Sequence, residues 1–165
     1  MKSNAMALAN YFVNLANNQN VELKLLGLIK RVYITHGFSL ALFDIPAIDP
    51  RFDVVEAWRL GPVIPSVYHS FKHFKDNKIT EEAVIADLKG GDIKYVTPEL
   101  TDKNTKEIAE KVWKRYFDYS DSELVKILHR KGTPWGMCYV EGKNNPIPDL
   151  YTKVYYKKLL SYATG

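Results

Sequence analysis

The feature that most constrains the fold is an apolar run at helical spacing that extends over residues 21–42. Its apolar members recur at intervals of three and four residues and lie on one helical face: Leu25, Leu28, Ile29 and Val32. The pattern continues through residues 38–42 and stops before Pro46, because proline lacks the N–H that a helix interior needs. The spacing predicts one long helix in which Gly27 and Gly37 are weak points, each costing about 1 kcal/mol relative to alanine.

Helical spacing recurs along most of the chain. It predicts further helices over residues 6–17, from Pro65 to about residue 74, over residues 102–117 and over residues 151–162. Ser120 and Glu123 match a capping box, in which the serine accepts from a backbone N–H and the glutamate returns the bond. Another helix is therefore expected to begin there and to end at Gly132, before a shorter helical turn that opens at Pro134.

Extended structure is expected in two short segments. Residues 44–62 are rich in proline and are interpreted as a loop with one brief strand, and a strand at residues 93–96 follows the turn at Gly90-Gly91. The predicted fold is mainly α. It is a single compact helical domain of about six helices over residues 6–165, with a minor two- or three-stranded β element near residues 52–60 and 92–97. Residues 1–5 are expected to be a tag remnant or a disordered start.

Composition restricts the classes of function. A chain of 165 residues with 46% hydrophobic and 25% charged side chains is typical of a soluble globular protein. The 23 Lys and Arg residues exceed the 19 acids only slightly, and acids separate the basic pairs, so nucleic acid is not an expected partner. One cysteine, Cys138, cannot form an intramolecular disulfide, and the sequence shows no signal-peptide pattern or uninterrupted membrane span. A cytoplasmic protein is expected.

The sequence lacks the motifs of common enzyme classes. It has no GxSxG elbow, no GxGxxG and no GxxxxGK[ST] phosphate loop, so hydrolase, dinucleotide and P-loop functions lose their usual support. His69 and His73 are spaced to hold one metal ion, but two lysines beside them would repel a cation, so no metal and no cofactor is expected. Cys138 is interpreted as a small core residue rather than a nucleophile.

Two alternative functions depend on particular side chains. One is a hydrolase or transferase for a small molecule, which would use Asp49, Asp53 and Glu56 with His36 or His129. Carboxylates on a loop are more often simply solvated.

The other alternative is a DNA-binding regulator of its own operon. The helices predicted near residues 106–117 and 121–131 are joined by a short turn, as in a helix-turn-helix. Asp121 and Glu123 would then lie at the end of the recognition helix that faces phosphates, which disfavours DNA binding.

Three stretches resemble the motifs of one protein family. Residues 28–42 are similar to its helix motif of a lysine, apolar residues, a tyrosine, a histidine-glycine pair and Leu-Ala-Leu, here with Tyr33 and His36. Residues 56–68 resemble its EAWxxGPVxPxxY segment, through Glu56, Trp58, Gly61, Pro62 and Tyr68. Residues 124–135 resemble its L…THxxGxPW segment, through His129, Pro134 and Trp135. On these motifs the chain is identified as a member of the Panacea domain family, found in SocA-type antitoxins and phage-associated GepA-like proteins.

The resemblance implies a non-enzymatic, cytoplasmic protein of a bacterium or prophage that binds and neutralises a toxin encoded by a neighbouring gene. Neutralisation by occlusion and by delivery to a cellular protease are both open. The chain departs from the family at Gly27, where many members carry a lysine, and at Phe38, which replaces a tryptophan. The first departure argues against a lysine-dependent contact at that end of the helix.

The motif residues are predicted to meet in space. Polar tips at turns are poor core material, because burying each one unpaired costs about 1–3 kcal/mol. We therefore expect the three segments to converge, with Glu56 accepting a hydrogen bond from His36, His129 or a tyrosine hydroxyl. Such a cluster either specifies the fold or forms the floor of the partner site. Core and interface positions are equally consistent with Trp58 and Trp135.

Overall fold

The computed structural model describes residues 4–164. Its helices are α1 (Asn4–Asn18), α2 (Leu25–Phe43), α3 (Pro65–Phe71), the 3₁₀ helix η1 (Lys72–Phe74), α4 (Lys103–Arg115), α5 (Asp121–Leu128), α6 (Pro134–Cys138) and α7 (Asp149–Thr164). Its strands are β1 (Glu56–Trp58), β2 (Gly61–Val63), β3 (Ile85–Lys89), β4 (Asp92–Val96) and β5 (Asn145–Pro146). The prediction of a mainly α fold with a minor β component is confirmed, with seven α-helices in the described part of the chain where about six were expected.

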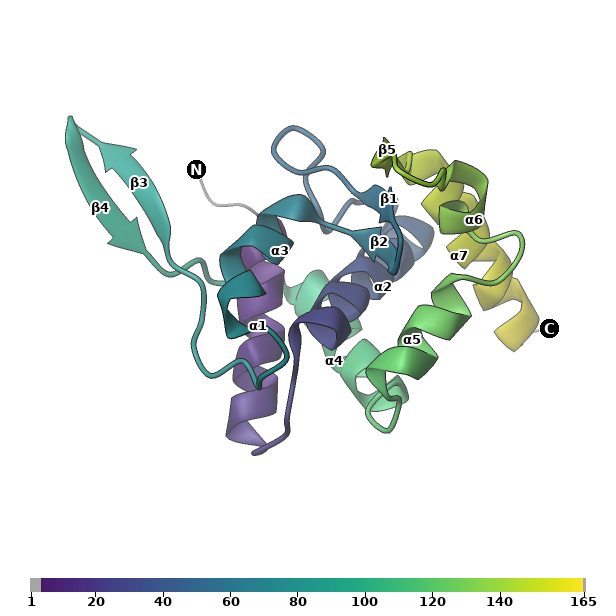
Figure 1. Ribbon diagram of the computed structural model, residues 1–165, viewed down its shortest axis with the longest axis horizontal. Coiled ribbons are helices and arrows are strands. Elements are labelled where there is room, and N and C mark those ends of the chain that lie inside the picture. Colours follow the sequence, from purple (N-terminus) through teal and green to yellow (C-terminus); the bar gives the residue numbers. More distant parts are fainter. Residues whose placement is uncertain (1–3, 165) are drawn as a thin grey trace.

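Helix α2 is the central element, and α1, α3, α4, α5 and α7 all contact it (Figure 1). Because neighbours cover it on nearly every side, it is apolar around most of its circumference. Its length and mean hydropathy also match those of a membrane span, but 72% of that stretch is buried inside the protein. Core packing therefore accounts for its apolar character.

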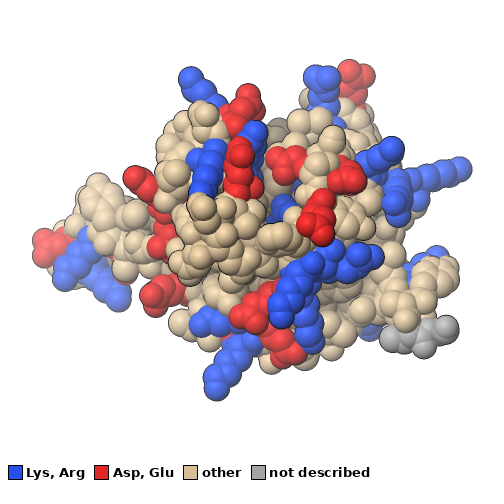
Figure 2. All heavy atoms as spheres, turned by 90° about the horizontal axis from the view of Figure 1, so that it is seen from below, with Lys and Arg blue, Asp and Glu red and all other residues tan. Residues whose placement is uncertain are grey.

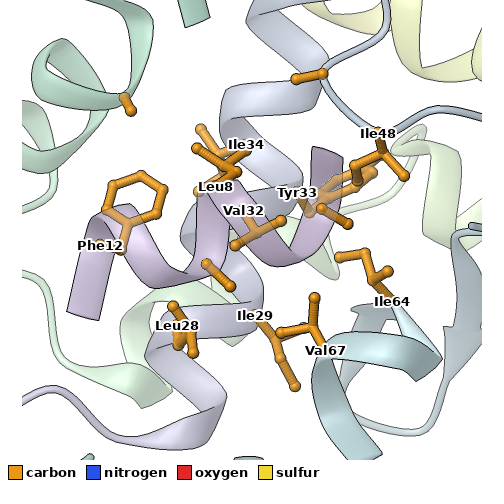
Figure 3. Packing of buried hydrophobic residues seen from close by; sticks show 14 of the residues in the cluster. Leu8, Phe12, Leu28, Ile29, Val32, Tyr33, Ile34, Ile48, Ile64 and Val67 are labelled. Atoms are coloured by element: carbon orange, nitrogen blue, oxygen red, sulfur yellow. The ribbon is translucent and has the colours of Figure 1, made fainter. Parts of the chain in front are cut away.

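The hydrophobic core forms where α1 crosses α2 (Figure 3). Leu8 and Phe12 of α1 are fully buried with Val32 of α2, and Ile64 and Val67 close the cluster from the β2–α3 segment. Helix α1 begins earlier than expected, since Asn4 is its first residue and Ala5 is fully buried. Residues 1–3 lie outside the described residues.

The strands form two separate antiparallel sheets, with the orders β2-β1-β5 and β3-β4. Both segments predicted to be extended contain strands, but the expected single β element is wrong, because the two segments do not pair with each other. Each instead pairs with its neighbour in the sequence across a two-residue turn, residues 59–60 for β1–β2 and residues 90–91 for β3–β4. A two-residue loop places sequential strands side by side as an antiparallel hairpin.

The predicted helix starts are confirmed where local chemistry sets them. Ser120 accepts from the Glu123 backbone N–H while the Glu123 carboxylate accepts from the Ser120 N–H, so the capping box is present. Pro65 and Pro134 occupy the first turns of α3 and α6. Helix α5 ends at Leu128, earlier than predicted, and Thr133 caps α6 through a bond from the Gly136 N–H.

Candidate functional site

The first and second motifs meet through a buried lysine. Lys30 of α2 is fully buried, and its ammonium donates a hydrogen bond of 2.9 Å to the Pro62 carbonyl in β2. Burial lowers the pKa of Lys30 to about 7, and the charge of Asp121 opposes this shift. Lys30 had no predicted role, because lysine is almost never fully buried. Its place in the first motif was the signal that could have revealed it.

The backbone conformation at position 61 explains why the second motif has a glycine next to Pro62. The Gly61 φ of +106° is a conformation that side chains rarely adopt. A Cβ at this position would lie 3.0 Å from the Lys30 Nζ and 3.5 Å from the His129 Nε2. The backbone therefore approaches two polar side chains, one from the first motif and one from the third.

The third motif forms an aromatic stack against the second. The His129 ring stacks on Trp135 at 3.9 Å between centroids, and Trp135 stacks on Tyr139 at 4.6 Å. The Trp135 indole N–H donates a 2.7 Å bond to the Trp58 carbonyl. The buried His129 Nε2 has no hydrogen-bond partner within residues 4–164, and burial, followed by the charge of Lys30, lowers the pKa of His129.

Glu56 takes part in a different contact from the one expected. Its carboxylate accepts a 2.6 Å bond from the indole N–H of Trp58, two residues along the same hairpin. The three segments do meet, but Lys30, Gly61 and the Trp58–Trp135 bond bring them together. Glu56 instead orients the Trp58 ring, which also makes an edge contact with Tyr68 at 5.0 Å.

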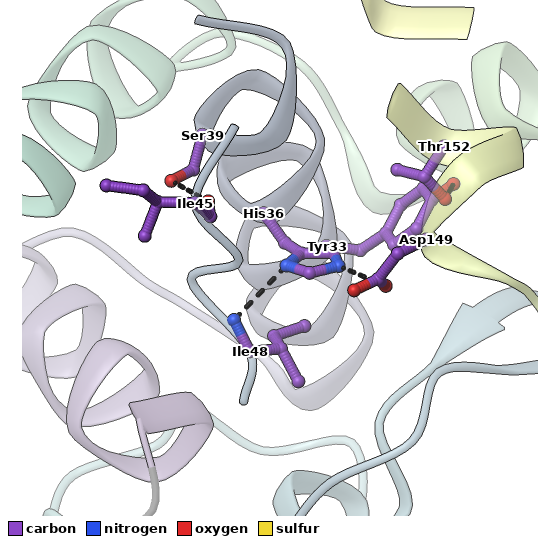
Figure 4. A network of polar contacts seen from close by, with 7 residues as sticks. All are labelled: Tyr33, His36, Ser39, Ile45, Ile48, Asp149 and Thr152. Carbon is purple, nitrogen blue, oxygen red and sulfur yellow. Dashed lines mark hydrogen bonds and ion pairs between the residues drawn. The ribbon is translucent and has the colours of Figure 1, made fainter. Parts of the chain in front are cut away.

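Tyr33 and His36 belong to a second polar network, at the contact between α2 and α7 (Figure 4). The buried His36 accepts from the Ile48 N–H at Nδ1, so its Nε2 carries the proton and donates to Asp149 at 2.9 Å. The Tyr33 and Thr152 hydroxyls are 3.2 Å apart. These bonds connect α2 to α7 and to the loop after α2.

The carboxylates of the enzyme alternative have other neighbours. Asp49 is partly buried and bound to the exposed Arg51, whose bonds lower the pKa of Asp49 to about 2. Asp53 accepts a bond from the Ser66 hydroxyl. Both ring nitrogens of His36 are bonded elsewhere, to Asp149 and the Ile48 N–H, and the Nε2 of His129 has no hydrogen-bond partner within residues 4–164.

The remaining candidate residues occupy ordinary positions. His69 and His73 are exposed and contact Tyr68 and Phe74, and no group of three potential metal ligands occurs in the described part of the chain. Cys138 packs partly against the core, and burial raises the pKa of its thiol.

The helix-turn-helix alternative meets an obstacle at the start of α5. Asp121 is half-buried, with the Arg31 guanidinium and the Gly27 backbone N–H among its partners, so this end of α5 faces α2. On the molecular face in Figure 2, Lys and Arg side chains are interspersed with Asp and Glu. Neither observation is typical of a recognition helix on DNA.

A groove of about 570 Å³ opens beside the motif cluster, between the start of α2, the β1–β2 hairpin and α3. Its apolar lining comes from Leu25, Leu26, Ile29, Trp58, Val63 and Tyr68. Leu60, at the tip of the hairpin, adds a large apolar side chain that is 51% exposed. Two motif residues, Trp58 and Tyr68, thus face accessible space.

Residues 28–136 match the model of the antitoxin SocA-like, Panacea domain family, a stretch that contains all three motifs. The chain belongs to this family. It is also 32% identical over 131 residues to the protein named Antitoxin SocA from Caulobacter vibrioides (strain NA1000 / CB15N). The aligned stretch covers 79% of this chain and 68% of that protein. No solved structure gives a significant match. The resemblance drawn from the motifs is confirmed, and the Panacea domain here carries its motifs on α2, the β1–β2 hairpin and the α5–α6 turn.

Proposed function

We propose that this Panacea protein is a non-enzymatic antitoxin that binds and neutralises a protein toxin encoded by a neighbouring gene, in the cytoplasm of a bacterium or from a prophage. The observation that carries the proposal is the family match, which spans the motif cluster and the adjoining groove. The name of the Caulobacter relative agrees with it.

Within this function the motif residues divide by exposure. Lys30, Tyr33 and His36 are fully buried and hold elements together, so they specify the fold. Trp58 and Tyr68 line the groove and are the motif residues that contact the partner. Trp and Tyr suit this task because they combine a large apolar surface with a polar tip.

Co-expression with the adjacent small gene tests the function. We expect this chain to restore growth in cells that produce the neighbour's product, and a complex of the two proteins to survive purification. Asp49→Asn combined with Glu107→Gln should rescue as well as the wild type, since neither carboxylate lines the groove. A harmless neighbour, or rescue without a complex, would contradict the proposal.

The route of neutralisation is measurable in the same cells. Occlusion leaves the half-life of the toxin unchanged or longer when the antitoxin is present. Delivery to a cellular protease shortens that half-life, and the effect disappears when the protease gene is deleted. Both routes require a complex of the two proteins, so the half-life of the toxin is the measurement that separates them.

A further inference from the structure

The groove combines an apolar floor with residue types that dominate binding energies. Trp58, Tyr68 and Arg59 line it together, and tryptophan, tyrosine and arginine are the side chains most enriched at the energetic centres of protein interfaces. Its volume of about 570 Å³ lies in the range of sites that enclose a ligand with several apolar groups. A helix or extended segment with two or three apolar side chains would fill it.

The rim of the groove carries a small excess of positive charge. Arg59 and Lys75 are exposed there, and neither forms an ion pair within residues 4–164. Of the two acids at the rim, Asp121 is directed toward Arg31 and the Gly27 N–H, which leaves Asp76 as the acid that faces outward. Lys24 is a third rim cation, paired at 3.4 Å with Glu22.

We propose that this groove receives an amphipathic segment of the toxin in which two or three apolar side chains are flanked by aspartate or glutamate. The inference rests on the proposed function and adds the chemistry of the partner. The apolar side chains lie against Trp58 and Leu60, and the acidic flanks pair with Arg59 and Lys75. Complementary charges of this kind select the partner and its register more than they add affinity.

The same charges disfavour other occupants. A second copy of the chain, bound through the same groove about a two-fold axis, would bring two cationic rims together. Nucleic acid would find an apolar floor and the carboxylate of Asp76 where phosphate contacts are needed.

Affinity measurements with matched variants test the inference. The probe is the purified product of the neighbouring gene, titrated against wild-type protein, Leu60→Asp and the double variant Arg59→Glu/Lys75→Glu. We expect each groove variant to weaken binding at least about tenfold, and the double variant to lose the salt dependence that screening gives the wild-type complex. The controls are Leu88→Asp, at an exposed leucine on the β3–β4 hairpin, and Lys94→Glu/Lys158→Glu, which alters net charge equally. They should bind within about twofold of wild type.

The outcomes separate the two proposals. If the wild type binds and the groove variants, with unchanged melting temperatures, bind equally well, the groove inference is wrong and the antitoxin function stands. If the wild type does not bind at all, both fall. When the wild type binds, a photo-crosslinking residue at position 60 identifies the toxin segment that occupies the groove. The toxin peptide attached to it should hold apolar residues with Asp or Glu beside them, and a basic or wholly polar peptide would overturn the inference.

Discussion

At the residue scale, the least expected feature is a lysine at the centre of the motif cluster. Within residues 4–164, Lys30 is buried and donates one hydrogen bond, to the Pro62 carbonyl, and its charge also lowers the pKa of His129. Removing an ammonium from water is costly, so such a group favours its neutral form. The fold therefore couples the protonation of Lys30 to stability.

The pH dependence of unfolding should report Lys30. Its pKa is about 7 in the folded protein, whereas the ordinary value is 10.5, so between these values the unfolded chain holds the extra proton. The free energy of unfolding then rises with pH across that window, by at most about 1.4 kcal/mol per unit. Urea denaturation from about pH 6.5 to about pH 9.5 should show this rise for wild type and for Lys111→Met, but not for Lys30→Met. Equal slopes in all three proteins would contradict the assignment.

Gly61 should resist replacement more than an ordinary glycine with positive φ. Gly61→Ala combines backbone strain of about 1–2 kcal/mol with crowding of Lys30, and we expect the free energy of unfolding to fall by about 2–4 kcal/mol. Gly142 is the matched control, because its φ is +75° but no atom lies within 4 Å of an added Cβ. Thermal and urea unfolding compare the two variants, and equal losses would show that Lys30 does not restrict the position.

At the element scale, the packing of α7 against α2 determines whether position 37 can accept a side chain. An added Cβ there would overlap the ring of Tyr156, which is fully buried between the two helices. The sequence interpretation of Gly37 as a weak point relative to alanine is therefore wrong in context, because close helix packing outweighs helix propensity.

Gly37→Ala should be destabilising although alanine is the better helix former. Overpacking against Tyr156 costs about 1–3 kcal/mol, more than the roughly 1 kcal/mol gained in propensity. Gly136→Ala in α6, where an added Cβ makes only ordinary contacts, should be neutral or mildly stabilising. Differential scanning calorimetry measures both, and a raised melting temperature for Gly37→Ala would refute the packing argument.

The β3–β4 hairpin is an arm that projects from the helices (Figure 1). Cross-strand pairs place four exposed residues on one face: Ala86, Leu88, Ile93 and Tyr95. A two-stranded hairpin alone is only marginally stable, so its amides should exchange with solvent much faster than those of α2. Leu88→Ser should change the free energy of unfolding by less than about 0.5 kcal/mol. Hydrogen exchange and urea unfolding test the two statements, and strong protection of the arm would contradict them.

At the scale of the whole molecule, the stretch matched by the family model does not include every helix that contributes to the hydrophobic core. Residues 28–136 exclude α1 and α7, yet Phe12 and Tyr156 from these helices are fully buried. Tyr33 and His36 also take their partners Thr152 and Asp149 from α7. The motifs therefore depend on helices outside the matched stretch.

A fragment limited to residues 28–136 should not fold cooperatively. Without α1 and α7 it exposes the faces of α2 that they cover, and loses more apolar burial than a marginally stable protein can spare. Circular dichroism should show no cooperative thermal transition for the fragment. The full chain with residues 85–96 replaced by a short Gly-Ser turn should keep its transition, since the arm covers little of the core. A fragment that melts cooperatively would disprove the dependence.

Much of the fold was predictable because its signals are local. The capping box at Ser120, the prolines that open α3 and α6, and the helical spacing each act within a few residues, so they hold in any tertiary setting. The pairing of β1 with β5 was not predictable, because the two strands lie far apart in the sequence. The candidate site divides in the same way: Trp58 and Tyr68 were found from a motif, whereas the exposure that separates them from Tyr33 and His36 is a property of the packed molecule.

The sequence by itself determined the helical class, the family and the set of motif residues, because helical periodicity and motif spacing depend only on the order of residues in the chain. The tertiary structure alone decided which motif residues are buried. It buried Lys30 against Pro62, directed His36 to Asp149 rather than Glu56, and opened the groove beside Trp58. The physical reason is that burial and hydrogen-bond partners depend on which surfaces meet, and that choice is made by the packing of distant helices as a whole.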